Sequence, residues 1–189
     1  MPERVYLDWN ATAPLRPEAR AAMLEAMDVL GNPSSVHAEG RAARGLVERA
    51  RGQIARLVGC EASEIVFTSG ATEAAALVLA SADAVGPPTE HDCVYAWAGR
   101  SDDQWQIDQN GQPRMQDRGA DDRLGGAILA VATSNGETGV LTDDPDGMAG
   151  NLEALPAGPR AGHILFRDAA QSIGRVPVDF RRLNASFLS

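Results

Sequence analysis

The sequence contains no lysine, since all 17 of its basic residues are arginine. Chemistry that needs a lysine amine, such as Schiff-base formation with a carbonyl compound, cannot be completed by this chain. Cysteine is also scarce: Cys60 and Cys93 lie in unrelated contexts, which excludes a disulfide framework and predicts no metal site. A cytoplasmic location is therefore expected.

Long apolar runs are missing as well. No run approaches the roughly 20 residues that a membrane-spanning helix needs, and the N-terminus lacks the pattern of a secretory signal. The net charge of -9 argues against nucleic acids and anionic membrane surfaces as partners. The 44% of hydrophobic residues in a chain of 189 is ordinary for a globular protein with one core.

The stretch Ile65–Glu73 organises the rest of the chain. Residues Ile65–Thr68 are β-branched or aromatic and predict a buried strand, Ser69-Gly70 ends it, and an apolar run to Ala80 predicts a helix. The first N–H groups of a helix have no partner within it and attract anions. The turn Gly70–Thr72 is therefore a candidate phosphate site, and a capped helix without ligand is the equally weighted alternative.

Apolar patterning predicts further elements. Helices are expected over Ala19–Leu30, Gly40–Gly59 and Val94–Ala98, strands over Ser81–Val85, Trp105–Ile107, Gly126–Thr133, His163–Phe166 and Asn184–Leu188, and a loop with a poor helix over Asp143–Gly158. We assign the helix over Gly40–Gly59 to core scaffolding. The alternation of strands and helices predicts an α/β fold with a mainly parallel sheet flanked by helices.

Polar residues gather near the predicted strand ends, where open α/β sheets bind ligands. Asp168 is either a helix N-cap or a charge aimed at a ligand, and Gln171 either completes a capping box or donates to a ligand. His91 alone is more often structural, and Asn135 is more often a turn residue. Together they match pyridoxal 5'-phosphate (PLP), which needs a phosphate cradle, a carboxylate beside its ring nitrogen and an aromatic group on its ring face.

The chain resembles the cysteine desulfurases of the class V aminotransferase family, which are fold type I PLP enzymes. The matching segments follow the family's order: residues 6–14, 31–37, 64–73, 89–91, 135–139 and 168–174. The resemblance implies that Gly70, Ala71 and Thr72 hold the phosphate. It implies that His91 stacks on the ring and assists proton transfer.

By the same resemblance, Asp168 pairs with the ring nitrogen and Gln171 bonds the phenolic oxygen. A second asparagine of the family's turn is Gly136 here, so its cofactor contact is lost or is supplied by Asn135. Cys93, two residues after His91, either approaches the cofactor or is a small core residue, and the core alternative weighs more.

The resemblance also implies a reaction, in which L-cysteine gives L-alanine and an enzyme cysteine receives the sulfur as a persulfide. It implies a homodimer, a sulfur-acceptor protein and a role in iron–sulfur cluster assembly. We expect an N-terminal arm over residues 1–18 and a partial PLP-binding domain over 19–189. The turn with the Schiff-base lysine is expected beyond Ser189, so this chain alone is predicted to be inactive.

Two other functions stay open at this point. One is another class V PLP reaction, such as that of selenocysteine lyase. The other is a truncated, lysine-free paralogue without catalysis that acts as a binding or scaffold subunit.

Overall fold

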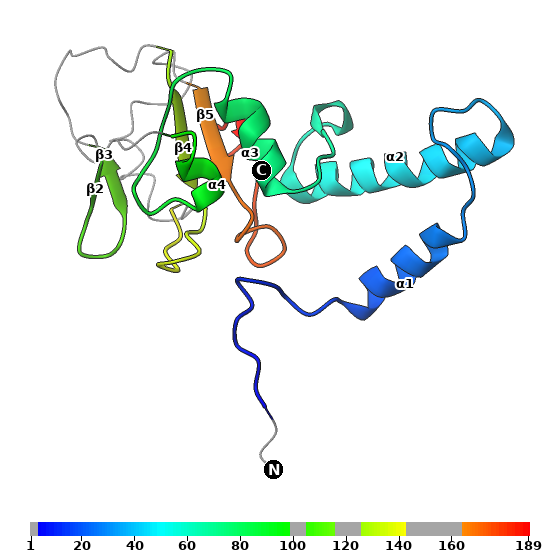
Figure 1. Cartoon of the computed structure of the whole chain (residues 1–189), viewed down its shortest axis with the longest axis horizontal. Helices are drawn as coiled ribbons and strands as arrows, with labels where there is room; N and C mark the ends of the chain where they lie inside the picture. The colour runs from blue at the N-terminus through cyan, green and yellow to red at the C-terminus, as the bar shows by residue number, and fades with distance from the viewer. Residues whose placement is uncertain (1–3, 99–104, 116–125, 143–163) are drawn as a thin grey trace. The chain divides into compact units, whose positions relative to one another are not determined.

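The computed structural model describes residues 4–98, 105–115, 126–142 and 164–189 (Figure 1). The predicted loop over Asp143–Gly158 lies outside these residues. The chain divides into two compact units, Met1–Leu57 with Glu61–Ile65, and Val58–Cys60 with Val66–Ser189. The predicted arm over 1–18 and domain over 19–189 stay predictions. No helix among the described residues has the length and apolarity needed to cross a membrane.

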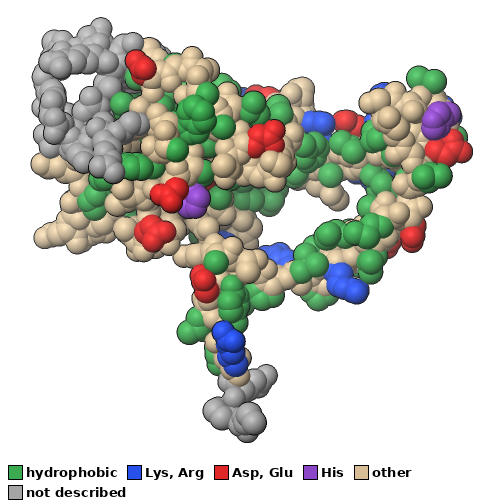
Figure 2. All heavy atoms as spheres, in the orientation of Figure 1, with side chains coloured by type: hydrophobic (Ala, Val, Ile, Leu, Met, Phe, Trp, Pro, Cys, Tyr) green, Lys and Arg blue, Asp and Glu red, His purple; other side chains and the backbone are tan. Residues whose placement is uncertain are grey.

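The first unit contains α1 (Pro17–Met27), most of α2 (Ala38–Val58) and the short 3-10 helix η1 (Ala62–Glu64). Helix α1 begins with a proline, whose fixed φ suits a helix start, and it has no buried residue. Figure 2 shows hydrophobic side chains exposed along the arm and α1. They include Val5, Leu7, Trp9, Met23 and Met27. This unit therefore presents a long apolar surface.

Helix α2 confirms the predicted helix but buries little of its apolar stripe. Ala43 and Ala55 are buried, whereas Leu57 is 58% exposed and Ile54 is partly exposed. The assignment of α2 to core scaffolding thus holds for Ala43, Ala55 and Val58 and not for Ile54 and Leu57. The helical spacing places the stripe on one face, but spacing alone does not say what covers that face.

The second unit contains a four-stranded sheet in the order β1-β4-β5-β6, and every pair in it is parallel. Its strands are β1 (Ala84–Val85), β4 (Ile128–Ala132), β5 (Ile164–Asp168) and β6 (Phe187–Leu188). A separate antiparallel pair joins β2 (Trp105–Ile107) to β3 (Pro113–Met115). The predicted α/β fold with a mainly parallel sheet is confirmed.

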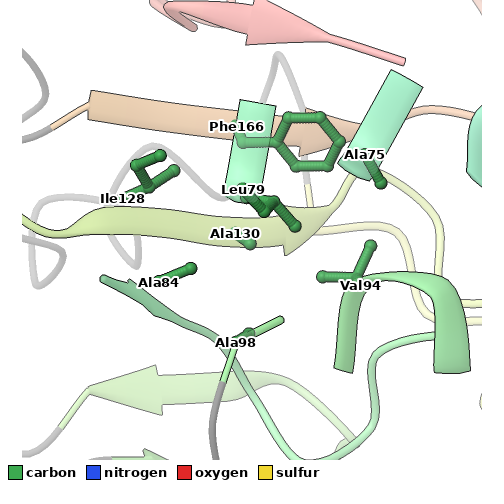
Figure 3. Packing of buried hydrophobic residues seen from close by; sticks show 8 residues of the cluster. All are labelled: Ala75, Leu79, Ala84, Val94, Ala98, Ile128, Ala130 and Phe166. Atoms are coloured by element: carbon green, nitrogen blue, oxygen red, sulfur yellow. The ribbon is translucent and has the colours of Figure 1, made fainter. Parts of the chain in front are cut away.

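The core of this unit lies where α3 (Ala71–Leu79) and α4 (Asp92–Tyr95) pack beside the central strands. Every residue of β4 is buried, as expected for a strand covered on both faces. Figure 3 shows Leu79 and Ala75 of α3 beside Phe166 of β5, with Val94 of α4 near Ala130 of β4. These contacts fix the start of α3 and the start of α4 near the end of the sheet.

The predicted strand over Ile65–Thr68 is wrong. The segment forms no strand, and Val66 is 76% exposed while Phe67 is 46% exposed. A strand needs a neighbour whose N–H and C=O groups complete its ladder, and no described strand pairs with this segment. β-branched residues pack well on a pleated, half-buried surface, but their presence does not provide the neighbouring strand.

Other element boundaries shift by a few residues. Helix α4 begins at Asp92, two residues before the predicted start, and β1 keeps only the last two residues of the predicted strand. Position 163 of the predicted strand over His163–Phe166 is outside the described residues, and β5 continues to Asp168. The extension matters because it makes Asp168 the last residue of a buried strand.

Candidate functional site

The start of α3 keeps the geometry expected of an anion site. Gly70 is the N-cap residue, and no side chain caps the helix there. Glu73 accepts from the Ser69 N–H through Oε2 at 2.6 Å, and this bond lowers the pKa of Glu73. Thr72 is exposed, and a Cβ at Gly70 would meet nothing within 4 Å. The first turn of α3 is thus open to a ligand, as a phosphate site requires.

Asp168 stands at the carboxyl end of the sheet. It is the register partner of Ala132 on β4 and is 7% exposed. Its Oδ1 accepts from the Ala170 N–H at 2.9 Å, and its carbonyl accepts from the Thr133 N–H at 2.8 Å. A turn follows it, so the alternative that Asp168 caps a helix is not met.

Gln171 and Asn135 lie on neighbouring turns beyond β5 and β4. The Gln171 side chain faces Gly136, since a Cβ added at Gly136 would lie 3.5 Å from Gln171 Cγ. Asn135 is buried: its Nδ2 donates to the Thr89 carbonyl at 2.7 Å, and its Oδ1 accepts from two backbone N–H groups, those of Glu137 and Thr138. These bonds favour the turn interpretation of Asn135, and its cofactor role stays a prediction.

His91 is the N-cap of α4. Its Nδ1 accepts from the Cys93 N–H at 3.2 Å and lies 3.0 Å from Cys93 Sγ. A neutral imidazole that accepts at Nδ1 carries its proton at Nε2. The ring is exposed, so Nε2 can donate to a ligand.

Cys93 joins the predicted site residues. Its thiol bonds to the Thr72 side chain and lies beside His91 Nδ1. Burial raises the pKa of Cys93, and the nearby Asp168 carboxylate raises it further. Thr72 and His91 therefore contact one half-buried sulfur, and the charge of Asp168 acts on the same group, although Thr72 and Asp168 are 96 positions apart. Cys93 also packs against the core cluster, which favours the core interpretation, and its approach to the cofactor stays a prediction.

Sequence reasoning gave no role to Glu90, which the structure places beside these residues. Glu90 is 8% exposed, and its Oε1 accepts from the Ala132 N–H at 3.0 Å. Burial raises the pKa of Glu90 to about 7; the bond from Ala132 and the charge of Arg167 oppose the shift, and Asp168 adds to it. The signal in the sequence was its place between Thr89 and His91 in a segment shared with the family.

Among the described residues of the candidate site we find no metal centre. Among the residues that the structure describes, no group of three His, Cys, Asp or Glu side chains lies close enough to hold a metal ion. The arrangement can bind a phosphate at α3, place a carboxylate against a cationic nitrogen and bring an imidazole to the same place. The role of each residue stays a prediction.

Comparison with known proteins agrees with this arrangement. The class V aminotransferase model matches residues 5–189. The chain is 36% identical to a cysteine desulfurase of Frankia sp. (strain EuIK1) over 94% of the chain and 46% of the relative. It is 31% identical to the selenocysteine lyase of Bos taurus over 98% of the chain and 51% of the relative.

A solved structure, that of a NifS-like protein from Rickettsia africae ESF-5, has the same fold. Its TM-score is 0.74 at 26% sequence identity, covering 98% of this chain and 53% of the other. The chain thus spans about half the length of the curated relatives that it matches. Because the family match extends over nearly the whole sequence, this chain belongs to the class V aminotransferase family.

Proposed function

We propose that this chain provides the PLP-binding part of a cysteine desulfurase, which converts L-cysteine to L-alanine and passes the sulfur to an enzyme cysteine. Class V aminotransferases and cysteine desulfurases use PLP. The observation that carries the proposal is that Thr72 and His91 both contact the Cys93 thiol, whose pKa the charge of Asp168 at the end of the parallel sheet also raises. This is the place where α/β sheets bind their ligands.

The residues present fit the cofactor. The open first turn of α3 and the exposed Thr72 hydroxyl suit a phosphate, and the buried Asp168 carboxylate suits a protonated ring nitrogen. When bound, PLP supplies an electron sink for the charge that develops on the substrate. Asp168 would hold the proton at the ring nitrogen. His91 would cover the ring and move a proton through Nε2, since Nδ1 accepts from Cys93.

We further propose that the parent protein is a cytoplasmic homodimer that delivers sulfur to an acceptor protein. The exposed apolar side chains of the arm and α1 support association, because monomeric proteins rarely expose large contiguous apolar surfaces. The similarity to cysteine desulfurases supports a sulfur acceptor.

Two other functions each have one observation in their favour. The similarity to bovine selenocysteine lyase favours C–Se cleavage, for which the same residues would hold the cofactor. The absence of lysine favours a binding or scaffold subunit without catalysis.

One experiment separates the three functions. A gene product that contains this chain and continues through a lysine-bearing turn is supplied with L-cysteine or L-selenocysteine together with a thiol reductant, which reduces the transferred sulfur or selenium to sulfide or selenide. Sulfide, selenide and alanine are then measured. Sulfide with alanine is expected from L-cysteine, with a large loss in His91→Ala and Asp168→Asn and none in the exposed control Glu25→Gln. Selenide alone would favour the lyase. No product from either substrate, with PLP bound, would favour the scaffold.

A further inference from the structure

Glu90 and Asp168 approach the same strand end from opposite sides. The Ala132 N–H on β4 donates to Glu90 Oε1, and the next N–H, that of Thr133, donates to the Asp168 carbonyl. Successive N–H groups of a strand point to opposite neighbours. Strand β1 pairs with β4 only at Ile128 and Leu129, so the Glu90 side chain provides the acceptor that a longer β1 would have provided.

The approach of Glu90 to the strand is fixed by its surroundings. Gly86 lies so close to β4 that a Cβ there would be 2.6 Å from the Ala130 carbonyl oxygen and 3.5 Å from Glu90 Cγ. The segment after β1 therefore runs against β4 and holds Glu90 in place. The Glu90 carboxyl group is thus buried at the end of the sheet and bonded to the backbone of β4.

Half of the Glu90 carboxyl group has no partner. Oε1 accepts from Ala132, but Oε2 is buried and no described residue bonds to it. An ionised carboxylate that is buried and half unsatisfied is costly, so such a site favours the neutral acid. The proposed function assigns no role to Glu90. The burial of its carboxyl group therefore needs a separate explanation.

The charged and titratable groups that face Glu90 come from β5 and α4. Asp168 of β5 opposes ionisation of Glu90, and Arg167 of β5 favours it. Burial raises the pKa of Cys93 of α4, and the charge of Glu90 raises it further, so the neutral thiol is favoured. Arg167 Nη2 donates a hydrogen bond to Thr142 Oγ1 at 2.9 Å, so part of the guanidinium group is bonded to that hydroxyl. Burial outweighs Arg167, and Asp168 is the neighbour whose charge a ligand would alter.

We propose that Glu90 and Asp168 form a carboxyl pair that keeps one proton on Glu90 while no cation is bound at Asp168, and that binding of a cation there releases this proton to solvent. A cation at Asp168 offsets the charge that disfavours ionisation of Glu90, so the two events are linked reciprocally. Glu90 is thus a positioning residue that sets the charge of the site. The release step rests on the proposed function, whereas the proton on Glu90 does not.

The first experiment needs no ligand. The full chain with 13C-labelled glutamate carboxyl groups is titrated by NMR as wild type, Glu90→Gln, Asp168→Asn and Glu25→Gln. We expect one glutamate resonance to titrate near neutral pH, to vanish in Glu90→Gln, to move to lower pH in Asp168→Asn and to persist in the exposed control. Near-UV circular dichroism checks that each variant is folded, and Asp168→Asn keeps the test valid if Glu90→Gln does not fold.

Two results would overturn the pair. If every glutamate titrates in the ordinary acidic range, Glu90 holds no proton at neutral pH. If the midpoint of Glu90 is the same in Asp168→Asn as in wild type, the two carboxyl groups are independent.

The second experiment tests release. Pyridoxine 5'-phosphate, which has the ring nitrogen and phosphate but no aldehyde, is titrated calorimetrically in two buffers of different ionisation enthalpy, about one pH unit below the Glu90 midpoint. Wild type should release more protons on binding than Glu90→Gln, and the difference between the two proteins cancels proton uptake by the ring itself. Equal proton numbers would overturn the release step. Absence of binding to wild type would contradict the proposed function and release together, while the NMR titration would still decide the pair.

Discussion

Cys93 places a thiol at the centre of the candidate site, where it bonds to Thr72 and lies beside His91. Burial and Asp168 both raise its pKa, so the neutral thiol is favoured. A cysteine that accepts sulfur acts as the thiolate, which this position disfavours. The surroundings of Cys93 therefore do not favour it as the cysteine that accepts the sulfur.

Glu90 gives a prediction at the residue scale for stability against pH. Its pKa in the folded chain is about 7, against an ordinary value of 4.5. Between these values the folded chain keeps a proton that the unfolded chain has lost, so the stabilisation is complete below pH 4.5 and is lost as pH rises to about 7. The loss amounts to about 3 kcal/mol at one pKa unit per 1.36 kcal/mol.

The measurement is urea unfolding of wild type and Glu90→Gln across this range. The amide is neutral at every pH, so the stability of Glu90→Gln relative to wild type should increase by about 3 kcal/mol from acidic to neutral pH. The control Glu25→Gln should stay parallel to wild type. A constant difference between wild type and Glu90→Gln would show that Glu90 titrates normally in the folded chain.

Thr72 gives a prediction for phosphate binding. Replacing its hydroxyl in Thr72→Val should weaken binding of pyridoxine 5'-phosphate about tenfold, because a hydrogen bond to a charged group is lost. Thr72→Ser should bind nearly as well as wild type, and Thr12→Val, in the exposed arm, should not change affinity. Calorimetry checks all three. An unaltered affinity in Thr72→Val would remove this hydroxyl from the phosphate site.

At the scale of elements, α3 offers a matched pair of leucines. Leu79 is 1% exposed and packs in the core, whereas Leu77 on the same helix is 62% exposed. Leu79→Ala should lower the free energy of unfolding by about 3 kcal/mol through lost burial and a residual cavity. Leu77→Ala should change it by less than about 0.5 kcal/mol. Urea unfolding measures both, and similar losses would mean that α3 packs differently from this structure.

The sequence predicts an element well where its apolar pattern also indicates how the element is buried. The apolar run at 126–133 predicts a buried strand, and every residue of β4 is buried. The helical spacing over 40–59 predicts that α2 forms, but it does not predict what covers its apolar face. The segment at 65–68 has an equally apolar composition but lacks a partner strand among the described residues, and pairing is a property of two segments.

The candidate site follows the same logic. Thr72 and Asp168 could be predicted because a helix start and a strand end bind ligands by backbone geometry, whatever the rest of the fold does. The contacts of Cys93 and Glu90 could not, since they depend on how the segment after β1 turns back against β4. Residue types and spacing do not encode that close approach.

At the scale of the whole molecule, the chain belongs to the class V aminotransferase family and spans about half of the length of the relatives that it matches. The site residues described here lie within one compact unit, Val58–Cys60 with Val66–Ser189. If the proposed function holds, binding of the cofactor by these residues can be tested on this chain without its covalent attachment, because the chain has no lysine.

The absence of lysine predicts how this separation appears in experiment. Covalent attachment of PLP in this family uses a lysine ε-amine, and no lysine occurs in the 189 residues. Purified chain mixed with PLP and reduced with borohydride should therefore show no stoichiometric pyridoxyl adduct on an internal residue by mass spectrometry, and it should release no sulfide from cysteine. The α-amine of Met1 is the only primary amine that can react. A gene product extended through the expected lysine turn should carry the adduct on that lysine. A stoichiometric adduct on an internal residue of the present chain would contradict the prediction, because arginine does not form this bond.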